Sequence, residues 1–72
     1  MWRELMVNVF DAKGEHRFGF GGFDVSEERV QKEVQAIKRN HPGQTISVLI
    51  REKKGGRWKE WKNGLLYPYS YK

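Results

Sequence analysis

The pattern of apolar and polar positions predicts a β-hairpin at the start of the chain. Residues 4–11 are rich in strand-forming side chains and lead into residues 11–14, where Asp opens and Gly closes a tight turn. A three-residue loop with Gly14 in the left-handed conformation brings the next segment back as a second strand. In this register Phe10 faces His16, Asn8 faces Phe18, and Met6 faces Phe20.

This register assigns the side chains of the first hairpin to two faces. One face has Met6, Phe10, Phe18 and Phe20, and the other has Leu5, Val7, Val9, Gly19 and Gly21. We expect the valine face to be core, with the two glycines letting a helix approach closely. Phe18 and Phe20 then lie on or near a face without a helix. The opposite assignment, with the phenylalanines in the core, is left open.

Residues 27–40 have the pattern of an amphipathic helix. Ser26 is a good N-cap, Glu27 and Glu28 favour the positive end of the helix, and Pro42-Gly43 follows as a stop. The apolar stripe is narrow and consists of Val30, Val34 and Ile37.

Residues 44–51 alternate like a half-buried strand, and Gly55-Gly56 supplies a tight turn into a further strand. A two-residue turn at these glycines predicts that Glu52 faces Lys59, Arg51 faces Glu60, Lys53 faces Trp58, and Ile50 faces Trp61. Both acidic residues of this hairpin then meet opposite charges. The side chains expected to meet the helix are those of Ile46, Val48, Ile50 and Trp61.

The C-terminal segment follows another turn signal, Asn63-Gly64. Residues 65–72 are expected to form a short fifth edge strand or an extended tail, with Leu65, Leu66 and Tyr67 completing the core. The predicted architecture is a single α+β domain over residues 1–72. It has an antiparallel four-stranded sheet in the order strand, strand, helix, strand, strand, one helix on one face, and the short fifth strand as an addition.

The positive charge is concentrated in the C-terminal part of the chain. The chain has a net charge of +5, and the whole excess lies in residues 44–72. A basic surface attracts phosphates or acidic proteins, although a charged face can also serve solubility alone. Trp58 can stack on a base beside these cations, or it can cover the stems of Lys53 and Lys62. The candidate nucleic-acid-binding residues are Arg51, Lys53, Lys54, Arg57, Trp58, Lys59 and Lys62.

The aromatic residues support an alternative interpretation. Ten Trp, Tyr and Phe side chains occur in a chain whose helix offers three good apolar positions, so one sheet face should carry large side chains near water. Such a face, an edge strand or the Tyr-rich tail suits a protein-interaction module, an adaptor or inhibitor that could also form a homodimer. The candidate residues are Phe18, Phe20, Leu49, Tyr69 and Tyr71.

The sequence does not support a zinc-binding protein, an enzyme, a cofactor-dependent protein or a membrane protein. There is no Cys, and His16 and His41 are too isolated for a structural zinc site. No nucleophile with a base, no paired carboxylates and no cofactor motif is recognisable, so we expect a binding module and neither an enzyme nor a cofactor-dependent protein. No run approaches the roughly 18 apolar residues of a membrane span, and the N-terminus lacks a secretory layout, so we expect a cytoplasmic protein without membrane contact.

Overall fold

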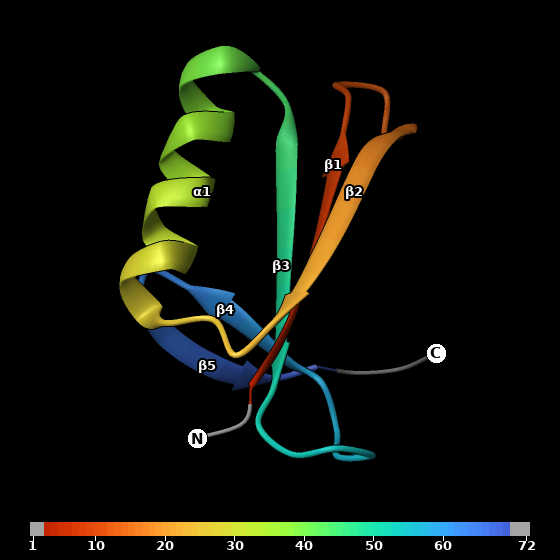
Figure 1. The fold of residues 1–72 in the computed structure, drawn as a ribbon. Coiled ribbons are helices and arrows are strands. Elements are labelled where there is room, and N and C mark those ends of the chain that lie inside the picture. The colour runs from red at the N-terminus through yellow and green to blue at the C-terminus, as the bar shows by residue number, and fades with distance from the viewer. Residues whose placement is uncertain (1–2, 70–72) are drawn as a thin grey trace.

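The computed structural model describes residues 3–69, which form one helix and a five-stranded antiparallel sheet (Figure 1). The strand order is β2-β1-β3-β4-β5, so β3 is the middle strand, β1 lies beside it, and β2 and β5 are the edges. This confirms the predicted α+β architecture and shows the fifth strand at an edge. The elements are β1 (Glu4–Phe10), β2 (His16–Phe23), α1 (Glu27–Asn40), β3 (Thr45–Arg51), β4 (Lys59–Lys62) and β5 (Leu65–Pro68).

The helix begins and ends where the sequence predicts, because the residues that cap it lie next to it in the sequence. The Ser26 hydroxyl accepts a hydrogen bond of 3.1 Å from the backbone N–H of Arg29. At the other end the His41 N–H donates to the Ile37 carbonyl at 2.7 Å. The predicted stripe of Val30, Val34 and Ile37 is buried.

The hydrophobic core lies between this stripe and one face of the sheet. Burying a valine or isoleucine side chain fully contributes about 1.5–3 kcal/mol, and Val7, Val9, Val30 and Ile50 are fully buried. The Trp61 indole N–H donates to the Glu27 carboxylate at 2.7 and 3.1 Å, which joins β4 to the first turn of α1. The strands contribute Leu5, Val7, Val9, Val48, Ile50 and Trp61 to the core.

The first hairpin contains a β-bulge that the sequence did not predict. Phe10 pairs with His16 as expected, and Gly14 has the expected positive φ of +85°. The register then shifts, so that Phe18 pairs with Val9. Arg17 is therefore the extra residue on β2. Beyond the bulge the pairs are Asn8 with Gly19, Val7 with Phe20, Met6 with Gly21, and Leu5 with Gly22.

The bulge moves every later side chain of β2 to the opposite face from the one predicted. Phe18 packs against the core, and Phe20 lies on the same side of the sheet as α1. The prediction that these phenylalanines lie on the helix-free face is therefore wrong. Gly19 and Gly21 lie on that face instead, and they do not provide a close approach for the helix.

The second hairpin also differs from its predicted register. Ile50 pairs with Lys59, and Leu49 with Glu60, so the partner strand is shifted by two residues. A shift of two preserves the faces, which is why Trp61 is still in the core as predicted. The tight turn at the two glycines is replaced by a loop over residues 52–58.

The last hairpin has the predicted two-residue turn, with positive φ at Asn63 and Gly64. Only one of the three residues expected to complete the core does so. Leu66 packs against the core, whereas Leu65 and Tyr67 are exposed because they alternate with it along β5.

The bulged register can be tested at two neighbouring glycines. A Cβ at Gly19 would lie 2.5 Å from Asn8 Oδ1 and 2.8 Å from the Val7 carbonyl oxygen, whereas one at Gly22 would come no closer than 3.4 Å to Val25. We expect Gly19→Ala to lower the free energy of unfolding by about 1–3 kcal/mol. Gly22→Ala, the matched control, should stay within about 0.5 kcal/mol of the parent in urea denaturation. Equal stability of the two variants would contradict the register.

Candidate functional site

The sheet face opposite α1 carries a group of exposed apolar side chains. They arise because side chains along a strand alternate, so every core position is followed by one that points away from the helix. Leu49 lies near the centre of this face and is only 7% exposed. Around it the more exposed members are Met6, Phe23, Leu65 and Tyr67.

Aromatic and charged side chains gather at one end of this helix-free face. The strand register places Phe23 beside Glu4, and Glu4 beside Arg51. The Arg51 guanidinium donates to the Glu4 carboxylate and lies 4.8 Å from the centre of the Trp58 ring. These four residues are called the end row below. Tyr69 follows β5 directly at the same end of the sheet.

The loop between β3 and β4, residues 52–58, projects from this same end, away from the β1–β2 turn (Figure 1). It is called the basic loop because it carries Lys53, Lys54 and Arg57, all exposed. Within residues 3–69, none of these three cations has a carboxylate oxygen within 4.0 Å. An open depression of about 350 Å³ is lined by Glu52, Lys53, Gly56, Arg57 and Lys59.

The other candidate cations already have acidic neighbours. Arg51 pairs with Glu4 in a part-buried contact. The expected facing of Glu52 and Lys59 is achieved as an ion pair of 3.3 Å despite the shifted register. Lys62 lies 3.5 Å from Glu60, the residue that had been expected to face Arg51. The structure thus separates cations engaged within the fold from those of the basic loop.

The residues expected on an aromatic interaction face are dispersed. Phe18 is partly buried, with its ring centroid 5.1 Å from that of His41, and Phe20 faces the helix side. Leu49 is on the helix-free face but offers little surface. Tyr69 is 39% exposed, and Tyr71 lies outside the described residues.

Sequence reasoning missed two exposed rings. Phe23 is 62% exposed and Tyr67 is 45% exposed. A signal for Tyr67 was available, because a two-residue turn at Asn63-Gly64 places Leu66 opposite Trp61 and therefore Tyr67 on the other face.

Metal and membrane sites find no support in the part of the chain that the structure describes. It has no group of three or more His, Asp or Glu side chains placed to hold a metal ion. His16 contacts the Asn8 side chain at 2.9 Å, and this contact also holds Asn8 over Gly19. The described helix is not long and apolar enough to cross a bilayer.

Comparisons with protein-family models, with curated proteins and with solved structures found no match. The end row and the basic loop are therefore the features from which a function can be inferred.

Removing a cation that is engaged within the fold should affect stability more than removing one from the basic loop. Arg51→Ala removes a part-buried hydrogen bond to Glu4 and should lower the free energy of unfolding by about 1–3 kcal/mol. Lys53→Gln, Lys54→Gln and Arg57→Gln should each change it by less than about 0.5 kcal/mol, because none of these cations has an ion pair within residues 3–69. Urea denaturation followed by circular dichroism measures both. A large loss at the basic loop would show that its cations are structural.

Proposed function

We propose that this domain binds single-stranded nucleic acid across the end row and the basic loop. The observation that supports the proposal is that aromatic rings, among them the exposed Phe23, occur at the same end of the sheet as cations that have no carboxylate partner within residues 3–69. Phosphates need cations that are not already neutralised, and bases need flat rings beside them. Both groups lie at the same end of the sheet in this chain (Figure 1).

The basic loop supplies the electrostatic part of binding. Each phosphate neutralised by a lysine or arginine releases condensed counterions, which favours association at low salt. Lys53, Lys54 and Arg57 suit this role because none of them has to give up an ion pair among the described residues. Lys59 and Lys62 are secondary, since each already contacts a carboxylate.

The end row supplies the stacking part. Base–aromatic stacking contributes about 1–3 kcal/mol per base, and it requires bases that are not already stacked in a duplex. Phe23 offers the largest exposed ring of the described chain. Trp58 is half-buried, and the Arg51 guanidinium lies over its ring, 4.8 Å from the ring centre. A base can stack on a guanidinium plane as well as on an aromatic ring. These features favour a single strand over a duplex.

An acidic protein is the competing partner, because it would be attracted by the same cations and could cover the exposed apolar side chains. The two partners differ in what they need from the rings. A base needs a π face, whereas a protein contact at the same position needs only apolar area. Replacing a ring by leucine therefore separates the two kinds of contact, because it removes the π face and keeps the surface apolar.

The electrostatic part is tested with a triple variant, Lys53→Gln/Lys54→Gln/Arg57→Gln, titrated into a fluorescently labelled mixed-sequence single strand. Three lost phosphate contacts should reduce the slope of log affinity against log salt by about 2, at about 0.7 per contact. The control, Lys13→Gln/Lys38→Gln/Arg39→Gln, removes the same charge elsewhere and should keep the parent slope. Equal slopes for both triple variants would contradict a site at the basic loop. No binding by the parent at low salt would reject the proposal and direct the search to protein partners.

The stacking part is tested by replacing rings with leucine, which keeps the surface apolar. Phe23→Leu and Trp58→Leu should each weaken single-strand affinity by about 5-fold to 150-fold, the equivalent of one lost stacking contact. Leu65→Ala, which removes exposed apolar area from the same face without removing a ring, should bind like the parent. Parent-like affinity of both leucine variants would show that the rings make no stacking contact.

A further inference from the structure

The two edges of the sheet differ in how well they are protected against pairing with another strand. Natural edge strands are short, charged or interrupted by proline, because a free row of N–H and C=O groups invites a further strand. The β5 edge has four residues and ends at Pro68. The β2 edge has eight residues without proline, and its charged residue, Arg17, is also the bulge residue near its start. The stretch from Phe18 to Phe23 is therefore uncharged and pairs regularly.

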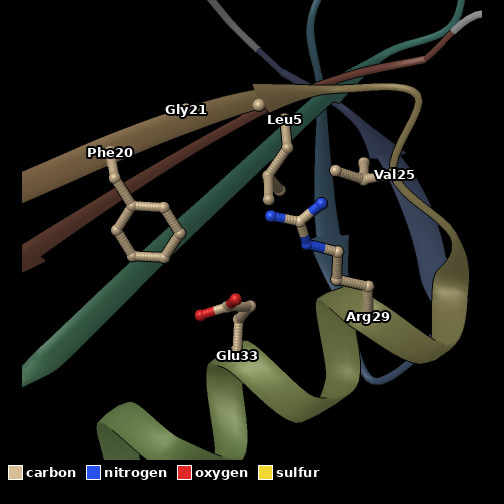
Figure 2. Close-up of a pocket in the computed structure, with 7 residues that line it drawn as sticks. Leu5, Phe20, Gly21, Val25, Arg29 and Glu33 are labelled. Carbon is tan, nitrogen blue, oxygen red and sulfur yellow. The ribbon is translucent and has the colours of Figure 1, made fainter.

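The apolar side chains beside the β2 edge are also incompletely covered. Figure 2 shows the Phe20 ring on the helix side of the sheet, with Arg29 and Glu33 projecting from α1 and Leu5 and Val25 nearby. These residues line a pocket of about 120 Å³ between β2 and α1. Phe20 is 36% exposed although it neighbours core residues. A strand added beside β2 would cover this ring.

The sequence of β2 is complementary to itself. If two copies of β2 run antiparallel with Phe20 facing Phe20, then Phe18 faces Gly22 and Gly19 faces Gly21. Large side chains thereby oppose small ones, and the central pair is aromatic, which is a favourable cross-strand pair. Antiparallel pairing also places the two Arg17 side chains at opposite ends of the new ladder, which avoids repulsion between them.

We propose that the β2 edge is a homodimer interface, at which two copies of the chain pair antiparallel about a two-fold axis at Phe20. The two sheets then join into one of ten strands, with both helices on the same face and both Phe20 rings between them. A second copy fits this edge because it presents the same pattern of large and small side chains in reverse. In this register Phe23, at the end of β2, faces Arg17 of the second copy, so the interface shares this one residue with the end row. Phe20, at the two-fold axis, belongs to neither the end row nor the basic loop.

The test uses opposite charges at the two-fold axis. Sedimentation equilibrium of the parent from micromolar to millimolar concentration should show a mass that rises from 8.6 kDa toward twice that value. Phe20→Glu and Phe20→Lys, each alone, place like charges opposite each other and should raise the dissociation constant about tenfold or more. An equimolar mixture of the two variants should recover the dimer, because Glu then faces Lys.

Leu65→Glu on β5 is the matched control, since it adds the same charge at an exposed apolar position of the other edge strand, and it should dimerise like the parent. Circular dichroism of each variant checks that the domain is folded. A parent that remains at the monomer mass throughout would overturn the proposal. Dimers that persist in both single Phe20 variants, or a mixture that does not recover, would overturn it as well. None of these outcomes depends on whether the chain binds nucleic acid.

Discussion

A single helix of fourteen residues has to cover a sheet of five strands, and this constraint determines which surfaces the fold exposes. The buried stripe of α1 has three residues, and the largest part of the core opposite it comes from the central strands β1 and β3. The second sheet face is left with Met6, Phe23 and Tyr67 near water. The same constraint leaves the β2 edge without an element beside it. The nucleic-acid surface and the dimer edge that we propose both follow from this incomplete coverage.

Local signals predicted the elements whose partners are close in sequence. The helix bounds follow from Ser26, from the acidic first turn and from the spacing of the apolar stripe, all within one segment. The Asn63-Gly64 turn was recognised because it requires positive φ at both positions, and these residue types tolerate it. The core face of β3 followed from strict alternation, which depends on no other strand.

Register between strands could not be predicted to the same degree. No local feature distinguishes Arg17 as a bulge residue, yet this one insertion decides on which side of the sheet Phe18 and Phe20 lie. In the second hairpin, the two glycines suggested a tight turn. The structure has a longer loop there, together with a Trp61 that packs in the core and donates a hydrogen bond to Glu27. Pairing decided over such distances depends on the assembled core.

In the candidate site, too, the features that depend on nearby residues were predictable and those that depend on distant residues were not. Its basic segment was identified from composition, because charge can be counted without knowing the fold. Which cations pair with carboxylates among the described residues was not predictable, since Arg51 pairs with Glu4, 47 positions earlier in the chain. A cation–π contact at Trp58 was expected from lysines, whereas the structure shows one with Arg51.

The junction between β3 and β4 has a consequence for motion. Only two residue pairs join these strands, compared with seven between β1 and β3, so the β4–β5 hairpin is attached by a short ladder together with the Trp61–Glu27 contact. Such a weakly joined unit opens before the rest of a domain unfolds. The β4–β5 hairpin is therefore the part of the sheet that separates first, while β1 and β3 stay paired.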